Sequence, residues 1–208
     1  MTTPTPETSA AFFAVSLLLA LSPGPDNVFV LMQSALRGRA AGLLVVLGLC
    51  SGLLVHTAAV AFGLATLFAT STLAFTLLKW AGALYLLLLA WQAWNARLGA
   101  PTAQPVPDAG GLYRRGIIMN VTNPKVSIFF LAFLPQFVAA ERGSVVVQVL
   151  WLGFIFMLAT LLVFGAIALT AGSVGQMLLR SARAQRWLNR CAALIFAALA
   201  LRLATVQL

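Results

Sequence analysis

Charged side chains, and acidic ones above all, are scarce in this chain of 208 residues. Charged residues make up 8% of the sequence, with four Asp+Glu against thirteen Lys+Arg, while hydrophobic residues make up 62%. A water-soluble domain has about a quarter charged residues. Disorder is excluded by the same composition, because disordered chains have low hydrophobicity. The composition therefore predicts an integral membrane protein that crosses the bilayer several times.

Histidine and cysteine are also scarce, which excludes several kinds of site. Cys50 and Cys191 lie in apolar segments without a CxxC or CxxH partner, and we interpret them as buried free thiols. With a single histidine, a metal site is not expected. The sequence has no Walker A loop, GxSxG or HExxH motif, so no cofactor is predicted. The net charge of +9 does not indicate a nucleic-acid partner, because the basic residues lie between long apolar runs and do not form a clustered basic surface.

Six apolar runs are long enough to cross a bilayer, since a transmembrane helix needs about 20 mostly apolar residues. They lie at approximately 10–33, 40–69, 73–98, 115–138, 144–172 and 187–207. The segment 99–112 is rich in Pro, Gly and Ala, which is typical of a linker. We therefore expect a single membrane domain, 1–208, with halves of about 1–98 and 113–208.

Basic residues lie mainly on one side of this predicted arrangement. The connections after the first, third and fifth runs carry most of them: Arg37, Arg39, Arg97, Arg114, Arg115, Arg180, Arg183, Arg186 and Arg190. Because cytoplasmic loops of membrane proteins are enriched in Lys and Arg, we expect this side to face the cytoplasm. With six spans, both termini then lie outside the cytoplasm.

The two halves are interrupted at similar places. Ser22–Asn27 breaks the first run and Asn120–Lys125 breaks the fourth, about half a chain apart. Three spans in each half require the halves to face opposite ways, and inverted repeats with Pro/Gly-interrupted helices indicate a transporter's substrate site. The alternative is that any two sets of apolar runs look alike by composition. We favour an all-α integral membrane protein of six transmembrane helices, in two inverted three-helix repeats with broken first and fourth helices.

The first interruption contains Pro23, Gly24, Pro25, Asp26 and Asn27. A proline inside a helix costs about 3 kcal/mol or more, so two prolines around a glycine should break it. Irregular backbone at membrane depth is tolerated only where it is buried in protein or lines a cavity. Ionisable residues inside the membrane are functional candidates, and we assign this segment to substrate binding. The alternatives are a kink for packing and, for Asp26, a structural ion pair.

The second interruption contains Asn120, Asn123, Pro124 and Lys125. Asn side chains both donate and accept hydrogen bonds, which suits freed backbone groups or a zwitterionic solute. We therefore assign these residues to substrate binding as well. Lys125 takes the position in the fourth run that corresponds to Asp26 in the first. We expect the two side chains to be close to each other near the pseudo-two-fold axis.

Two residues are candidates for proton coupling, namely Asp26 and His56. Asp26 is an ionisable group at a helix break, where access can alternate between the two sides. Histidine is a residue type that can carry a proton, which makes His56 the second candidate, although a lone histidine is more often a packing residue. Two GxxxG spacings in and before the second run predict close helix contacts through Gly38, Gly42, Gly48 and Gly52.

Several segments, taken in order, resemble the LysE/RhtB family of bacterial amino-acid exporters. They are Leu21–Asn27, Arg37–Gly42 with the glycine-rich run up to His56, Lys79–Leu86, and Asn120–Lys125 continuing into Phe129–Phe137. The resemblance implies an inner-membrane secondary exporter of amino acids that works by proton antiport. The amino-acid sequence of the third and fourth runs resembles the homoserine/threonine-type branch more than the exporters of basic amino acids.

The resemblance also carries over to particular residues. Pro23, Gly24, Pro25, Asp26, Asn123, Pro124 and Lys125 fall on the family's motif positions. Family members carry either Asp or Asn after the second motif proline, which puts a general coupling role of Asp26 in doubt. The expected partners are an amino-acid substrate, protons and the lipid bilayer, and a homodimer stays open.

Two other functions stay open beside amino-acid export. The first is export of another small solute, such as a cation or a toxic metabolite. The second is a membrane thiol oxidoreductase, which needs its two cysteines at equivalent positions of the repeat. Cys50 lies in the second run and Cys191 in the sixth, so they are not equivalent, and we do not expect an enzyme.

Overall fold

The computed structural model describes residues 3–22, 24–70, 108–171 and 182–205, with scattered helical residues between Thr76 and Asn95. No strand occurs in these ranges, so the described chain is all-helical. Its elements are α1 (Pro6–Leu21), α2 (Pro25–Arg37), α3 (Arg39–Thr70), α5 (Ala109–Val121), α6 (Pro124–Ile128), the π-helical η1 (Phe129–Phe133), the 3-10 turns η2 (Leu134–Phe137) and η3 (Ala140–Arg142), α7 (Val145–Thr170) and α9 (Ala182–Thr205).

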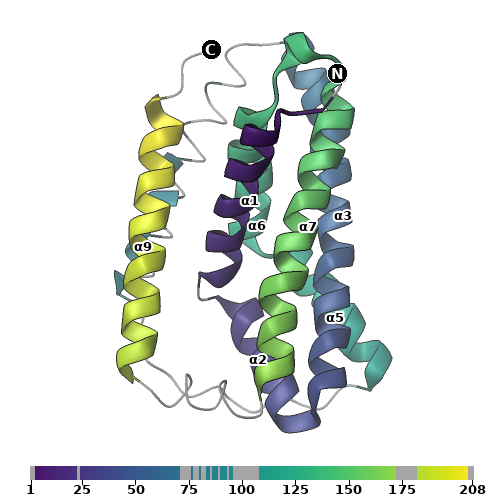
Figure 1. The fold of residues 1–208 in the computed structure, drawn as a ribbon, viewed down its shortest axis with the longest axis vertical. Helices are drawn as coiled ribbons and strands as arrows, with labels where there is room; N and C mark the ends of the chain where they lie inside the picture. Colours follow the sequence, from purple (N-terminus) through teal and green to yellow (C-terminus); the bar gives the residue numbers. More distant parts are fainter. Residues whose placement is uncertain are drawn as a thin grey trace.

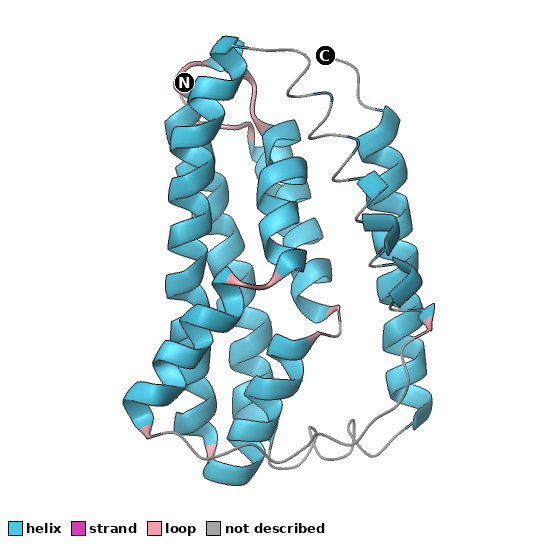
Figure 2. Ribbon diagram, turned by 180° about the vertical axis from the view of Figure 1, so that it is seen from behind, coloured by secondary structure: helices cyan, strands magenta, loops and turns pink. Residues whose placement is uncertain are grey.

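The helices run along the long axis of a bundle (Figures 1 and 2). Helix α3 packs against α5, α7 and α2, and α1 packs against α7. In Figure 1 the start of α1 and the end of α9 lie at the upper end of the bundle. The turn between α2 and α3 and the first residues of α5 and α9 lie at the lower end. The described residues next to the arginine-rich connections therefore lie at the same end of the bundle.

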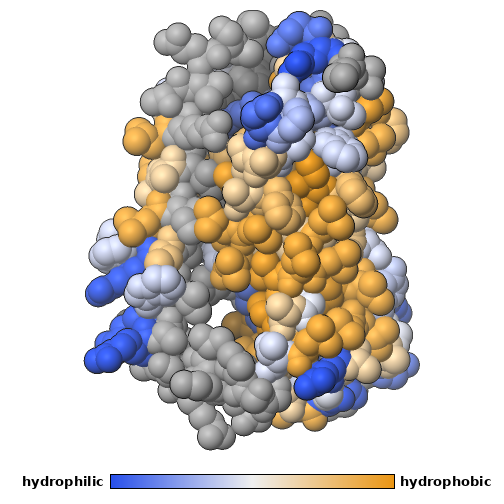
Figure 3. Space-filling view, viewed as in Figure 1, coloured by the Kyte–Doolittle hydropathy of each residue, from blue (hydrophilic) through white to orange (hydrophobic). Residues whose placement is uncertain are grey.

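Two helices are individually long and apolar enough to cross a membrane, namely α3 over Arg39–Gly63 and α7. They match the expected spans 40–69 and 144–172. Two further helix pairs meet the same requirement as bent spans: α1 with α2, at 64°, and α5 with Pro124–Phe137, at 47°. Apolar side chains cover the middle of the visible face, and hydrophilic ones gather toward its ends (Figure 3). The chain is thus a helical membrane protein.

The structure describes the third and sixth expected spans only in part. Only scattered residues of the run 73–98 are described, and Lys79 and most of the linker lie outside the described residues. Helix α9 covers most of the sixth run, but its first turns carry Arg183, Arg186 and Arg190, which shorten its apolar stretch. The six-span count and the inverted repeat therefore stay predictions.

Helix α5 begins inside the segment expected to be linker. Its first residue is Ala109, four residues before the expected start of the second half at 113. The side chain of Asp108 accepts a hydrogen bond of 2.7 Å from Gly111 N. This N-cap satisfies a free backbone donor and lets the helix begin in a glycine-containing sequence.

Both predicted helix breaks are present. Helix α1 ends at Leu21 and α2 begins at Pro25, while α5 ends at Val121 and α6 begins at Pro124. Each second half-helix begins with proline, whose missing N–H and fixed φ suit the first helical position.

Beyond the second break the helix continues irregularly, which the sequence did not predict. The backbone widens into a π-helix over η1 and tightens into 3-10 turns over η2. Six phenylalanines hold this segment against α1 and α7, with neighbouring ring centroids 5.0–6.3 Å apart: Phe12, Phe129, Phe130, Phe133, Phe137 and Phe156. The irregular segment thus lies in the aromatic core of the bundle.

The glycine spacing of α3 does permit close helix contact. A Cβ atom built on Gly48 would lie 2.9 Å from the Cα of Gly116 in α5 and would also meet the carbonyl of Tyr113. A Cβ atom on Gly52 would lie 2.7 Å from the Cβ of Asn120. The absence of side chains at these positions brings α3 directly against the backbone of α5. This contact sets the position of the second break along α3.

Candidate functional site

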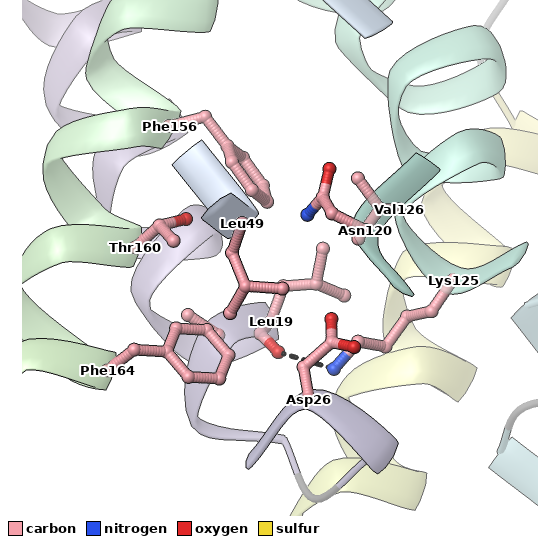
Figure 4. Close-up of a pocket in the computed structure, with 10 residues that line it drawn as sticks. Leu19, Asp26, Leu49, Asn120, Lys125, Val126, Phe156, Thr160 and Phe164 are labelled. Atoms are coloured by element: carbon pink, nitrogen blue, oxygen red, sulfur yellow. Dashed lines mark hydrogen bonds between the residues drawn. The ribbon is translucent and has the colours of Figure 1, made fainter. Parts of the chain in front are cut away.

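A small cavity lies where the two breaks face α3 and α7 (Figure 4). Three predicted site residues line it: Asp26 from α2, Asn120 from the end of α5, and Lys125 from α6. The remaining lining residues are Leu19, Ala20, Leu49, Val126, Phe156, Thr160 and Phe164. Its volume is about 10 Å³, which is room for roughly one water molecule. This conformation is therefore closed to an amino acid.

Asp26 presents one bonded and one unbonded carboxylate oxygen. The side chain is 4% exposed, and its Oδ2 accepts a 2.7 Å hydrogen bond from Asn123 Nδ2. Its Oδ1 has no hydrogen-bond partner among the described residues. The carboxylate lies in the first turn of α2, where the partial positive charge of the helix end favours an anion. One oxygen is thus fixed, and the other can accept a hydrogen bond from a ligand.

Lys125 binds the carboxyl end of α1. Its Nζ donates to the carbonyl oxygens of Leu19, at 3.2 Å, and Ser22, at 3.1 Å. These carbonyls have no intrahelical donors because they belong to the last turn of a helix, and the partial negative charge there favours a cation. The ammonium group has three donors, so one is left for another acceptor.

The sequence left open whether Asp26 and Lys125 form an ion pair, and no such pair is among the contacts of the described residues. Asp26 and Lys125 line the same cavity, and Figure 4 draws both side chains at its lower edge. The carboxylate bonds to Asn123, however, and the ammonium group bonds to the carbonyls at the end of α1. The end of α1 thus provides carbonyl acceptors for Lys125, which cannot be read from an alignment of the two halves.

Asn123 and His56 hold the second break. The side chain of Asn123 caps α6, because its Oδ1 accepts a 3.0 Å hydrogen bond from Lys125 N. The carbonyl oxygen of Asn120 lies 3.1 Å from His56 Nε2. A carbonyl can only accept, so this nitrogen carries the hydrogen. The His56 ring also packs against Phe130, with centroids 5.6 Å apart. His56 therefore binds the backbone of the break and is not part of the cavity lining.

The other predicted site residues that the structure describes lie around the cavity without lining it. Gly24 precedes α2, and a Cβ atom there would lie 3.4 Å from Lys125 Nζ. Asn27 donates a 2.8 Å hydrogen bond to the carbonyl of Ala20. Pro25 and Pro124 are exposed and begin α2 and α6. Pro23 lies outside the described residues.

Sequence reasoning missed the wall of the cavity that α7 provides. Phe156, Thr160 and Phe164 come from an unbroken helix, so no proline, glycine or charge pointed to them. Their regular spacing of four residues places them on one helix face, and Thr160 is a polar residue in a very apolar run. That combination is the signal that could have identified them.

Neither a metal site nor a disulfide is found in the part of the chain that the structure describes. No group of three His, Cys, Asp or Glu side chains there is arranged to hold a metal ion. Cys50 on α3 and Cys191 on α9 are free thiols and half-buried. Neither of them lines the cavity.

Comparison with known proteins identifies the family. The homoserine/homoserine lactone efflux proteins of Salmonella typhimurium and Salmonella typhi are 39% and 38% identical to this chain over 134 residues. An uncharacterized membrane protein of Vibrio cholerae is 36% identical over the same length. Each alignment covers 64% of this chain and 65% of the relative, so the chain spans a little under two thirds of these relatives. No solved structure matches. The family model of the LysE type translocators matches residues 17–207, and the chain therefore belongs to that family.

Proposed function

We propose that this protein is a secondary active exporter of small neutral amino acids, of the size of homoserine, across the bacterial inner membrane. The family and the names of the Salmonella relatives support export as the activity. The observation that carries the proposal is the cavity between the two helix breaks. It combines a carboxylate oxygen without a partner, a lysine with one donor left and an uncharged wall.

A zwitterion fits these groups. The substrate ammonium binds Asp26 Oδ1, and the substrate carboxylate binds the remaining donor of Lys125 and the amide of Asn120. Figure 4 shows the Asn120 amide nitrogen turned toward the cavity. A buried charge is tolerated only when it is paired and hydrogen-bonded. The zwitterion satisfies both protein charges at once, whereas a simple cation leaves Lys125 without a counterpart.

The two bent spans supply the moving parts of the proposed cycle. With room for about one water molecule, the cavity must widen before an amino acid enters. Broken helices at a central site allow one part of a transporter to rock against another. We assign the motion to α1–α2 and α5–α6, which move against the continuous helices α3 and α7.

Proton antiport follows from competition at Asp26. The same carboxylate oxygen binds either a proton or the substrate ammonium. Substrate entering from the cytoplasm displaces the proton inward, and reprotonation from outside releases the substrate there. Asp26→Asn should abolish export driven by a pH gradient while leaving exchange of substrate down its own gradient. Full pH-driven export by this variant would contradict the mechanism and transfer the coupling role to His56.

The basic end of the bundle is assigned to the cytoplasm. The α2–α3 turn carries Arg37 and Arg39, and basic residues are enriched in cytoplasmic loops. Single cysteines introduced at this turn should react with membrane-impermeant reagents only from the cytoplasmic side. Cysteines before α1 and after α9 should react only from outside. A C-terminal cysteine labelled from the cytoplasm would contradict the six-span topology.

The export activity is tested by efflux from loaded cells. Peptidases inside cells release free amino acids from dipeptides, and the release of each amino acid into the medium is followed with and without the protein. Homoserine and threonine should leave faster from cells that contain the wild-type protein, and lysine should not. Equal efflux of every amino acid with and without the protein would contradict the proposed function.

The other two functions have less support. A thiol oxidoreductase needs cysteines at its reactive centre, and Cys50 and Cys191 lie outside the cavity lining. The variant with both cysteines changed to serine should export at the wild-type rate. A simple cation has no negative group to pair with Lys125 at the site. Inorganic or organic cations should therefore not compete with homoserine efflux.

A further inference from the structure

The cavity has two chemically different sides. Its charged and amide groups come from the broken segments, namely Asp26, Asn120 and Lys125. The opposite wall is one face of α7, and it consists of Phe156, Thr160 and Phe164 (Figure 4). Residues four apart lie above one another on a helix, so Thr160 is a single hydroxyl between two aromatic rings.

The hydroxyl group of Thr160 differs from those of three other buried residues of the helices. Those of Ser16, Ser34 and Thr57 each donate a 2.7 Å hydrogen bond to the carbonyl four residues earlier. Thr160 is just as buried, at 2% exposed, but its hydroxyl group makes no hydrogen bond among the described residues, and the residue lines the cavity. A hydroxyl group at a cavity wall that is not bonded to the protein is free to donate to, or accept from, a ligand that enters the cavity.

We propose that Thr160 is a specificity-determining residue of the transport site and recognises a hydroxyl group on the side chain of the substrate. This inference rests on the proposed export of amino acids. When the broken segments bind the ammonium and carboxylate groups, the side chain of the substrate points to the opposite wall. Phe156 and Phe164 lie one turn to either side of Thr160 and limit the length of that side chain.

This arrangement selects substrates by one polar group. A site that hydrogen-bonds a substrate hydroxyl rejects an analogue without it, because a buried polar group is then left unpaired. L-Homoserine and L-norvaline have side chains of the same length, and differ in a terminal hydroxyl or methyl group. The wild-type protein should therefore prefer homoserine, and the preference should depend on the Thr160 hydroxyl.

The test is transport of both amino acids into everted membrane vesicles that contain the full-length protein. Thr160→Val keeps the shape of the side chain and removes the hydroxyl, and it should lower the homoserine-to-norvaline ratio of kcat/KM about tenfold. Norvaline transport itself should stay at the wild-type rate or rise. Thr160→Ser restores a hydroxyl and should keep the wild-type ratio. Thr170→Val is the matched control, because Thr170 lies on the same helix but is exposed and bonds its hydroxyl to Ala166 O.

The possible outcomes separate this inference from the proposed function. An unchanged ratio in Thr160→Val, or an equal loss of both substrates in Thr160→Val and Thr160→Ser, would overturn the role of Thr160 while leaving export intact. A wild-type protein that transports neither amino acid would overturn the proposed function itself, and the inference with it. Because the ratio is internal to each variant, differences in expression do not affect it.

Discussion

The first helix break, between α1 and α2, and the second, between α5 and α6, leave helix-terminal backbone groups without intrahelical partners. At the first break Lys125 donates to the carbonyls of Leu19 and Ser22, and Asn27 of α2 donates to the carbonyl of Ala20. No side chain caps the start of α2. At the second break Asn123 caps α6 directly, and His56 from α3 binds the carbonyl of Asn120.

The first break therefore depends more on the second break than the second depends on the first. The first break is held by its own Asn27, through one hydrogen bond, and by two hydrogen bonds from Lys125, which lies more than a hundred residues away in the second break. The second break is held by its own asparagine and by a continuous helix, and a single hydrogen bond from Asn123 to Asp26 connects it back. We infer that the second break is the fixed partner, and that the first break changes whenever Lys125 changes its contacts.

Lys125→Met should have the largest effect. It removes both donors to the end of α1 and leaves Asp26 as a buried charge without a neighbouring cation. Stranding a buried charge typically costs about 3–5 kcal/mol. The free energy of unfolding of the purified protein in detergent measures this loss. The double variant Asp26→Asn/Lys125→Met should unfold less readily than Lys125→Met alone, and strict additivity would show that the two residues do not interact.

Gly52→Val should disturb the second break without touching the first. The new Cβ atom lies 2.7 Å from the Cβ of Asn120, so α3 and α5 must move apart. Overpacking of this kind costs about 1–3 kcal/mol. Unfolding in detergent gives the magnitude, and Gly63→Val is the control, since a Cβ atom on Gly63 meets nothing within 4 Å. Equal effects of the two substitutions would contradict the close contact.

Asn123→Ala should weaken both breaks moderately. It removes the cap of α6, which is worth about 1 kcal/mol, and it frees Asp26 Oδ2. Asn123→Asp keeps the cap but puts a second carboxylate beside Asp26, and it should restore stability only at a pH that protonates one of the two. Unfolding of the three proteins over a pH series separates the cap from the bond to Asp26.

His56→Gln should have the smallest effect, because the amide can still donate to Asn120 O. His56→Leu removes the donor and should lower stability by about 1 kcal/mol. Both variants should retain export driven by a pH gradient, since the proposed proton site is Asp26. If His56→Gln abolishes pH-driven export but keeps stability and exchange, His56 carries the proton instead.

The breaks were predictable from sequence because their causes are local. Proline and glycine at 23–25 and the asparagines around Pro124 prevent a continuous helix whatever packs against it. The partners of Lys125 were not predictable in the same way. Matching the halves suggested Asp26, but the carbonyls at the end of α1 became acceptors only once the bundle had folded. Thr160 and the π-helical segment likewise depend on tertiary packing, and neither has a local signature strong enough to stand out from an apolar run.

The close contact of α3 with α5 limits which substitutions the protein tolerates at two positions. Gly48 and Gly116 face each other with no space for a Cβ atom, and the atoms in the way belong to backbone, which cannot rotate aside as a side chain does. Every codon change that replaces either glycine adds at least that atom. A randomised library under selection for a working protein should therefore lose its variants at these two positions, while lipid-facing sites such as Leu162 accumulate them freely.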